Sequence, residues 1–265
     1  MSIHPTAVIS AKAALGEDVS VGPFAVIDED VRIGDGSVIG AHAVIHRYTT
    51  LGPGCRVHAG AVLGDVPQDL SFQGATSSVE IGARCVIREG VTIHRGTKEG
   101  TATVVGDECF LMAFSHLGHN VRLGNAVILA NGVLLAGYVE VGDRVFISGH
   151  AGVHQFVRIG RLTMVTGLSG VSKDVPPFCL VGVGRNVIAG LNIVGLKRAG
   201  LAPDARKQIK AAFDLLYRSG LNVSQALERM RKEFPDGPAA ELWRFVEASK
   251  RGICAFREAA ESDAA

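Results

Sequence analysis

A period of six residues runs through the first two thirds of the chain. From Ile3 to Val171, every sixth residue is aliphatic except Asp69, Ala75 and Glu99. Six is a multiple of the two-residue period of a strand and not of the 3.6-residue period of a helix. The pattern therefore predicts a repeat array of short extended segments joined by regular bends, without helices.

The residues next to the aliphatic position repeat as well. Glycine often follows it directly, as Gly16 and Gly22 do, and there we expect backbone dihedrals that glycine adopts most easily. The position two residues before it is small or β-branched. Three of the five cysteines occupy that position: Cys55, Cys85 and Cys109. Because no CxxC spacing occurs, we interpret the cysteines as packing residues and expect neither disulfides nor a structural zinc.

This pattern resembles the hexapeptide repeat of left-handed parallel β-helices, in which three hexapeptides form one triangular coil. The resemblance implies the left hand, and it places residues that are one coil apart in the sequence on the same edge, about 4.8 Å from one another. Two excursions interrupt the series, at about residues 65–79 and 97–103. Polar loops that leave a solenoid often carry binding groups, so both are candidates for such a role.

The repeat is expected to stop at the paired prolines Pro176 and Pro177. Beyond them the apolar residues recur at helical spacing, which predicts helices over about residues 203–218, 224–234 and 238–250. We therefore divide the chain into a β-helix of residues 1–191 and a C-terminal helical domain of residues 192–265. Such a domain could cap the open end of the solenoid.

Charge and hydropathy exclude several classes of protein. Twenty-seven Lys and Arg against 26 Asp and Glu give a net charge of +1, so no overall field favours a nucleic acid. Residues 197–232 are locally basic, with nine Lys and Arg against three acidic residues. The start of the chain has no charged and apolar leader, and the apolar stretch 126–141 is too short to span a membrane. We expect a cytoplasmic protein.

Several segments resemble the bacterial UDP-N-acetylglucosamine 3-O-acyltransferases, which catalyse the first step of lipid A synthesis. They are Pro67-Gln68-Asp69-Leu70, residues 87–97 with the sequence IREGVTIHRGT, Ser115-His116-Leu117-Gly118-His119, and Leu191-Asn192-Ile193 with Gly195-Leu196-Lys197-Arg198. The similarity extends from about His4 to Gly252. It implies transfer of a 3-hydroxyacyl group from acyl carrier protein to the sugar 3-hydroxyl, without a covalent enzyme intermediate, cofactor or metal, in a homotrimer with sites between subunits.

The reaction needs a general base, because a sugar hydroxyl is a poor nucleophile at neutral pH. By its place in the motif, His119 matches the catalytic base of the family. Gly137 follows His119 by three hexapeptides, and Gln155 follows Gly137 by three more, so the three residues should share one edge. Gly137 matches the residue whose backbone N–H stabilises the oxyanion, and the absence of a side chain there lets a thioester approach closely.

The resemblance assigns further residues to the substrates. Asp69 and His94 match contacts to the sugar nucleotide, and His116 matches a substrate-contacting histidine near the base. Asn192 and Arg198 match groups that hold the uridine and its phosphates. His154 and Gln155 either contact substrate or pack at a corner of the coil. Gly167 matches the position that limits the length of the acyl chain, and glycine there predicts about 14 carbons rather than 10. Acyl carrier protein is acidic, and it would suit the basic residues Lys197, Arg206, Lys207 and Lys210.

Four residues depart from the family pattern at the border of this site. Asn120 stands where the family usually has Asp, Ser71 where it has Lys, Tyr138 where it has His, and Val194 where it has Glu. Asn120 can orient an imidazole by hydrogen bonding, but it has no charge to stabilise the imidazolium. Ser71 and Val194 leave open whether a 3-amino analogue of the sugar nucleotide is the acceptor.

Three other functions are compatible with a hexapeptide repeat. A sugar N-acyltransferase would use the same base, but the segments 92–97 and 191–198 favour the O-acyltransferase. A γ-class carbonic anhydrase needs three histidines around zinc, and neither His116 nor His119 has another histidine three hexapeptides away in the sequence. A scaffold without catalysis would keep its function without His119.

Overall fold

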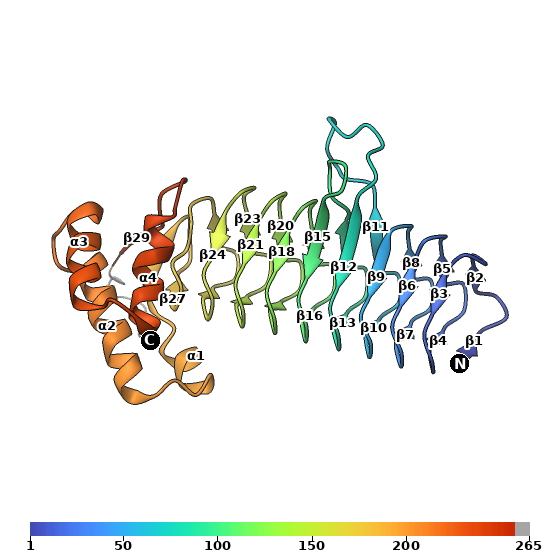
Figure 1. Ribbon diagram of the computed structural model, residues 1–265, viewed down its shortest axis with the longest axis horizontal. Helices are drawn as coiled ribbons and strands as arrows, with labels where there is room; N and C mark the ends of the chain where they lie inside the picture. Colours follow the sequence, from blue (N-terminus) through green and yellow to red (C-terminus); the bar gives the residue numbers. More distant parts are fainter. Residues whose placement is uncertain (258–265) are drawn as a thin grey trace.

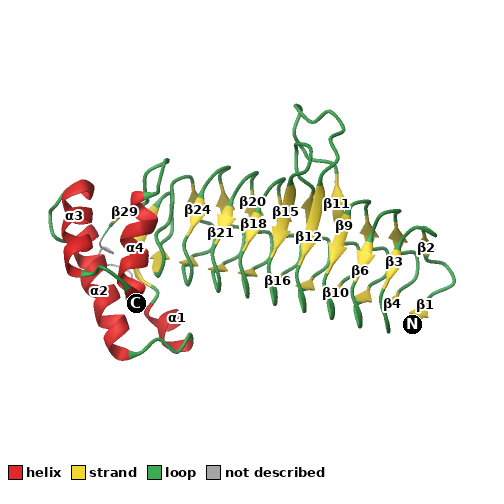
Figure 2. Ribbon diagram, in the orientation of Figure 1, coloured by secondary structure: helices red, strands yellow, loops and turns green. Residues whose placement is uncertain are grey.

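The computed structural model describes residues 1–257 as a β-solenoid followed by a small helical region (Figure 1). Its coils form a left-handed parallel β-helix, and this helix has three faces because every third strand returns to the same sheet. Among the described residues, the sheets contain 12, 9 and 8 strands. Most strands are two residues long and alternate with turns, as the period of six predicts (Figure 2).

The first sheet contains, in spatial order, β1 (Ser2–Ile3), β4 (Ser20–Val21), β7 (Val38–Ile39), β10 (Arg56–Val57), β13 (Val86–Ile87), β16 (Phe110–Leu111), β19 (Ile128–Leu129), β22 (Phe146–Ile147), β25 (Met164–Val165), β27 (Cys179–Val181), β28 (Val187–Leu191) and β29 (Ala255–Phe256). The second contains β2 (Val8–Ile9), β5 (Val26–Ile27), β8 (Val44–Ile45), β11 (Val62–Asp65), β14 (Thr92–His94), β17 (His116–Leu117), β20 (Leu134–Leu135), β23 (Gly152–Val153) and β26 (Gly170–Val171). The third contains β24 (Arg158–Ile159), β21 (Glu140–Val141), β18 (Arg122–Leu123), β15 (Ala102–Val105), β12 (Ser78–Ile81), β9 (Thr49–Leu51), β6 (Arg32–Ile33) and β3 (Ala14–Leu15).

The pairing register shows where the predicted coil length of three hexapeptides holds. Val44 pairs with Val62, and His116 pairs with Leu134, and each pair has this regular spacing. Val62, however, pairs with Thr92, and Thr92 pairs with His116, so both of these coils are longer. The two excursions add the extra residues, and the register of β11 against β14 shifts between Leu63 and Asp65. Both excursions project from the same side of the coil (Figure 1). The prediction that stacked residues lie three hexapeptides apart is therefore wrong across residues 65–103.

The aliphatic side chains of the period-six series fill the interior of the coil. From β4 onward these residues are buried, and the small position two residues earlier is buried with them. The cysteines are free and buried, and Cys55, Cys85 and Cys109 line one inner corner. Their thiols contact carbonyl oxygens of the next coil, as the Ser37 hydroxyl does at the equivalent position, which fits a packing role.

The reason for the glycines differs from the sequence prediction. The left-handed residue of a turn lies three positions after the aliphatic one, where Phe24, His42 and Asn120 have φ of 57°, 56° and 60°. With the exception of Gly64, whose φ is 85°, the glycines directly after an aliphatic position of the series do not have positive φ. They are needed because a Cβ would press on the next coil: on Gly34 it would lie 2.6 Å from the backbone nitrogen of Pro53. Close stacking of coils selects these glycines.

The coil continues past the paired prolines for one strand. β27 pairs in parallel with β25, and β28 then turns back and pairs with β27 in the antiparallel sense. The expectation that the repeat stops at Pro176 is thus wrong for the first sheet. Four helices follow: α1 (Ile193–Arg198), α2 (Pro203–Tyr217), α3 (Val223–Glu233) and α4 (Gly237–Glu247). The last three lie within a few residues of the predicted bounds, but α1 was not predicted.

The helical region is joined to the end of the coil by polar contacts and by a returning strand. The Arg158 guanidinium donates to the carbonyl oxygens of Phe245 and Ala248 at the end of α4, and Arg161 pairs with Glu241. β29 pairs with β28, so the chain comes back to the solenoid. The two ends of the described chain lie far apart along the coil axis, and the helices cover the C-terminal end (Figure 1).

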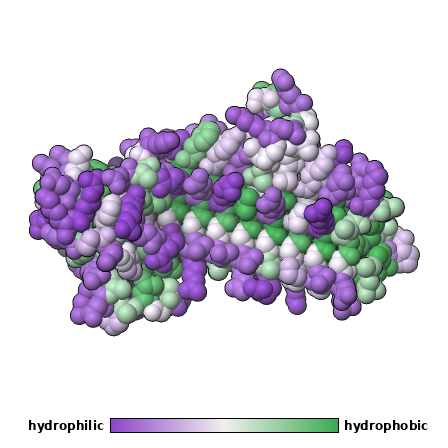
Figure 3. All heavy atoms as spheres, viewed as in Figure 1, coloured by the Kyte–Doolittle hydropathy of each residue, from purple (hydrophilic) through white to green (hydrophobic). Residues whose placement is uncertain are grey.

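Surface polarity differs along the molecule. On the face seen in Figure 3, apolar residues form rows along the coils, and most of the helical region is hydrophilic. Within residues 1–257, no helix has both the length and the apolar character that crossing a bilayer requires.

Candidate functional site

A groove of about 860 Å³ runs over the outer face of the second sheet. One end contains His94, His116 and His119. Toward the C-terminal coils, small and apolar residues line the groove together with polar side chains, which are His154, Gln155, Ser172 and Arg185. The lining residues include His94, His116, His119, Leu134, Ala136, Gly137, Gly152, Val153, His154, Gln155, Gly170, Ser172 and Arg185. Residues of β14, β17, β20, β23 and β26 thus contribute to a single surface.

His119 lies at the end of β17, where the coil turns from the second sheet to the third. Its Nδ1 is 3.1 Å from Asn120 Oδ1, and its ring meets Tyr138 edge to face at a centroid distance of 5.2 Å. The ring also lies against Gly137, where any Cβ would overlap it. Only 14% of the side chain is exposed. In the neutral imidazole, a proton on Nδ1 can donate to Asn120 Oδ1, which only accepts, and this tautomer presents Nε2 as an acceptor.

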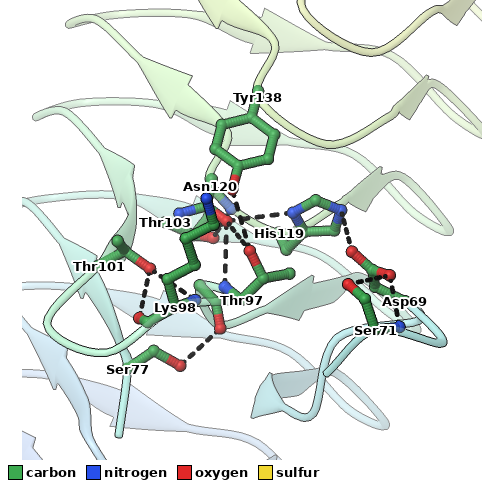
Figure 4. A network of polar contacts seen from close by, with 11 residues as sticks. Asp69, Ser71, Ser77, Thr97, Lys98, Thr101, Thr103, His119, Asn120 and Tyr138 are labelled. Atoms are coloured by element: carbon green, nitrogen blue, oxygen red, sulfur yellow. Dashed lines mark hydrogen bonds and ion pairs between the residues drawn. The ribbon is translucent and has the colours of Figure 1, made fainter. Parts of the chain in front are cut away.

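Asn120 and Tyr138 occupy the left-handed turn position of consecutive coils, which brings their side chains together beside His119. Asn120 Oδ1 also accepts hydrogen bonds from the backbone N–H and the hydroxyl of Thr97, each 3.1 Å long. The Asn120 N–H donates to Thr103 Oγ1. These bonds connect the turn after His119 to both ends of the second excursion (Figure 4).

Asp69 reaches the site from the first excursion. Its Oδ2 lies 3.8 Å from His119 Nε2, and its Oδ1 accepts hydrogen bonds from the backbone N–H and the hydroxyl of Ser71 (Figure 4). These two bonds hold the pKa of Asp69 below its ordinary value, with a smaller contribution from His119. The carboxylate of Asp69 therefore faces Nε2 of His119.

His94 and His116 contact each other at the wall of the groove, with ring centroids 4.9 Å apart. Burial lowers the pKa of His94, and burial together with His94 lowers the pKa of His116 to about 4. Both rings are therefore neutral at pH 7, and Thr92 Oγ1 lies 2.7 Å from His116 Nδ1. They are suited to neutral hydrogen bonding with a substrate.

The prediction that no third histidine lies near His116 and His119 is wrong. The second excursion makes this coil longer than three hexapeptides and brings His94 beside His116, close to His119. Nevertheless, among residues 1–257 no group of three His, Cys, Asp or Glu side chains has the arrangement of a metal site.

Asp69 faces His119 without lining the groove, and three other predicted site residues lie outside the groove altogether. The Asn192 side chain caps α1: its Oδ1 accepts from Gly195 N–H and its Nδ2 donates to the carbonyl oxygen of Leu162, each at 2.9 Å. Arg198 is exposed at the end of the same helix. Gly167 follows β25, and a Cβ there would lie 3.1 Å from Gly149 O. Within one chain, these residues and His119 do not form one site.

Some residues of the site were not predicted. Thr97 and Thr103 lie at the two ends of an excursion, where the period of six gives no guide to spatial neighbours. Tyr138 was noted only as a departure from a family pattern. The exposed side chains Phe114 and Leu134, which are 70% and 54% accessible, also line the groove. An outward-pointing Leu in the period-two pattern is the signal that could have identified Leu134.

Two family models match the chain. The model described as bacterial transferase hexapeptide (six repeats) matches residues 12–47, 30–65 and 102–137. The model described as Udp N-acetylglucosamine O-acyltransferase, domain 2, matches residues 174–254. The first covers coils of the β-helix, and the second begins in its last coil and includes the four helices.

Curated relatives and solved structures agree with these matches. An acyl-[acyl-carrier-protein]--UDP-N-acetylglucosamine O-acyltransferase of Gloeothece citriformis is 47% identical over 64% of this chain and 62% of its own length. The Anaeromyxobacter protein of the same name is 44% identical over 73% of this chain and 76% of its own length. The chain thus spans about two thirds to three quarters of the length of these relatives.

The fold is also shared over almost the whole chain. A UDP-N-acetylglucosamine acyltransferase from Bacteroides fragilis superposes with a TM-score of 0.90 at 39% identity, covering 94% of this chain and 98% of that one. The Campylobacter jejuni structure gives 0.91 at 38% identity, covering 97% and 100%. The coil and its repeats define the chain as a transferase of the hexapeptide class. Within that class, it belongs to the UDP-N-acetylglucosamine O-acyltransferase family.

Proposed function

We propose that the chain transfers a 3-hydroxyacyl group from acyl carrier protein to the 3-hydroxyl of UDP-N-acetylglucosamine in the cytoplasm, as the first step of lipid A biosynthesis. The observation that carries the proposal is the setting of His119: its Nδ1 faces Asn120 Oδ1, and the residue lines the end of the groove that contains three histidines. Family membership supports the choice of both substrates.

In this reaction His119 Nε2 accepts the proton of the sugar hydroxyl while the hydroxyl oxygen attacks the thioester carbonyl carbon. The C–O bond forms, the carbonyl becomes a tetrahedral oxyanion, and its collapse breaks the C–S bond. The proton on His119 then passes to the leaving thiolate. A positioned base of this kind accelerates such a step by roughly 10² to 10⁴.

Gly137 is suited to stabilise the oxyanion. Among the described residues, none accepts a hydrogen bond from the Gly137 N–H, and the residue adjoins the His119 ring. A donor in this role contributes about 10² to 10³ in rate. The thioester carbonyl would thus lie between Nε2 of His119 and the Gly137 amide, with its acyl chain in the apolar part of the groove.

The acceptor sugar would bind among Asp69, His94, His116 and Gln155, which surround His119. Asn192 and Arg198 can contact the uridine and its phosphates only if α1 of a second subunit lies over this groove. We therefore include a homotrimer in the proposal, with each site formed between two subunits. Because the Asn192 carboxamide caps its helix, its contact with the nucleotide would use the remaining Nδ2 proton.

Acyl carrier protein would meet the basic residues of the helical region. Lys207 and Lys210 are exposed and, within residues 1–257, pair with Asp204 and Asp214 of their own helix, so their charges remain accessible to an acidic partner. Reversal of charge at Arg206 and Lys207 should raise the KM for the acylated carrier severalfold at low salt. An unchanged KM would remove this part of the proposal.

One observation favours a second acceptor. Ser71 donates both of its hydrogen bonds to Asp69, so this carboxylate faces the reacting position without a lysine beside it. Such a carboxylate could hold the amino group of a 3-amino analogue of the sugar nucleotide. The product would then be an amide, as in the sugar N-acyltransferases.

The test is acyl transfer by the purified protein from 3-hydroxymyristoyl carrier protein, with UDP-N-acetylglucosamine and its 3-amino analogue offered separately. His119→Ala should abolish transfer to either acceptor. His150→Ala, which removes an exposed imidazole outside the groove, serves as the matched control and should stay active. Full transfer by His119→Ala would leave the base unassigned, whereas a His119→Ala protein that transfers no acyl group but keeps full cellular function would support a scaffold.

A further inference from the structure

We propose that Thr97 is a positioning residue that decides which nitrogen of His119 carries the proton. It acts by fixing the orientation of the Asn120 carboxamide. The inference rests on the proposed function, in which His119 Nε2 must be free to accept a proton. Thr97 itself lies behind Asn120 at the start of the second excursion, away from the groove lining (Figure 4).

The orientation of Asn120 follows from its partners. The oxygen of a carboxamide accepts hydrogen bonds and its NH₂ group donates them. The two possible orientations of the group exchange the positions of these two atoms. The Thr97 backbone N–H can only donate, so the atom that it faces at 3.1 Å is Oδ1. The Thr97 hydroxyl donates to the same oxygen. Two donors from one residue therefore hold Oδ1 toward His119.

Tyr138 completes this chain of hydrogen bonds. The single proton of the Thr97 hydroxyl is directed to Asn120, so the Tyr138 hydroxyl, 3.0 Å from Thr97 Oγ1, is the donor of that pair. Asn120 is only 8% exposed, which leaves little water to stabilise another arrangement. Tyr138 thus donates to Thr97, and Thr97 donates to Asn120 Oδ1. His119 Nδ1 supplies the remaining donor to the same oxygen.

The chemical reason is the asymmetry of asparagine. A carboxylate at this position would accept through either oxygen, whatever its neighbours. A flipped Asn120 would instead present its NH₂ to Nδ1, which would favour the tautomer with the proton on Nε2. That tautomer cannot accept a proton from the sugar hydroxyl. A chain with asparagine here therefore depends on Thr97 in a way that a chain with aspartate does not.

The experiment combines four variants with two readouts. Thr97→Val keeps the shape and the backbone N–H but removes the hydroxyl, Thr97→Ser restores a hydroxyl, and Asn120→Asp removes the need for orientation. The double variant Thr97→Val with Asn120→Asp closes the cycle. Thr101→Val, which removes a hydroxyl bonded to Lys98 in the same excursion, is the matched control.

We expect Thr97→Val to lower kcat/KM about five- to tenfold, because the loss of one hydrogen bond lowers the population of the productive Asn120 orientation by about that factor. In the Asn120→Asp variant, the same Thr97→Val substitution should lower kcat/KM by less than about twofold. Thr97→Ser and Thr101→Val should stay near wild type. Equal losses in both backgrounds would overturn the inference, because they would indicate a general packing effect.

The second readout does not need activity. Imidazole ¹⁵N NMR of the histidine-labelled protein at pH 8, assigned with His119→Ala, should show Nδ1 protonated in the wild type. Thr97→Val should add the tautomer protonated at Nε2. Because Thr97→Val keeps the backbone N–H, an unchanged tautomer in this variant overturns the role of the Thr97 hydroxyl even in an active enzyme. If no acceptor is acylated, the proposed function fails, and this comparison still decides the role of Thr97.

Discussion

The imidazole of His119 occupies the space that a side chain on Gly137 would fill, since a Cβ there would overlap the Cε1 and Nε2 atoms of the ring. Gly137→Ala should therefore displace the base without straining the backbone, which has no left-handed φ at this residue. We expect kcat to fall about 100-fold, as displacements near 1 Å do elsewhere. Gly149→Ala, whose new methyl makes only an ordinary contact, controls for folding. A normal kcat for Gly137→Ala would contradict this arrangement.

Coil stacking predicts a stability cost at the glycines that follow the aliphatic position. In Gly34→Ala the new Cβ would lie 2.6 Å from Pro53 N. The position of this Cβ is fixed by its own backbone, and Pro53 N belongs to the backbone of the next coil, so neither atom can move independently. We expect a loss of about 1–3 kcal/mol in the free energy of unfolding, as for other overpacked sites. Chemical denaturation measures it. Stability equal to wild type would mean that the coils can separate locally.

The inner cysteine column should tolerate serine. Cys85 Sγ lies 3.1 Å from the carbonyl oxygen of Gly106, and Ser37 makes the same contact with Gly52 two coils away. Cys85→Ser should therefore change the free energy of unfolding by less than about 1 kcal/mol, while Cys85→Leu should lose about 1–3 kcal/mol by overpacking. A large loss for serine would point to a role of the thiol beyond packing.

The buried histidine pair predicts a pH dependence of stability. The pKa of His116 is about 4 in the folded chain, below the ordinary 6.5, so the unfolded chain binds the proton more readily. Stability should therefore fall as the pH decreases from about 6.5 to 4, and level off below. His116→Asn, which can replace the contact with Thr92, should reduce this slope in urea titrations at several pH values. An unchanged slope would assign it to other groups.

Gly167 lies outside the groove of its own chain, so it can limit the acyl chain only at a site between two subunits of the proposed homotrimer. Because a Cβ there already meets Gly149 O at 3.1 Å, a longer side chain at this position has to extend away from the coil surface. Gly167→Met should shift the ratio of kcat/KM toward 10-carbon over 14-carbon donors by about tenfold or more. Taking the ratio within each protein cancels any loss of folded enzyme. An unchanged ratio would exclude Gly167 from the acyl site.

Much of the fold followed from the sequence because a period of six is compatible with strands and bends alone. The aliphatic positions and the small positions before them are buried, and three helices lie near their predicted bounds. The role of the glycines did not follow, because a glycine that avoids a clash and a glycine that adopts a left-handed φ look the same in a sequence. The sequence did not predict the short helix α1 either, because six residues show too little helical periodicity.

For the site, the sequence by itself determined the residues of an edge wherever the coil keeps its regular length, such as His119, Gly137 and Gln155. Only the tertiary structure decided what happens across the excursions, where loop length alters the spacing and no local pattern records it. It brought His94 to His116, Asp69 to His119 and Thr97 to Asn120. These contacts depend on the path of loops through space, and they join residues that lie far apart in the chain.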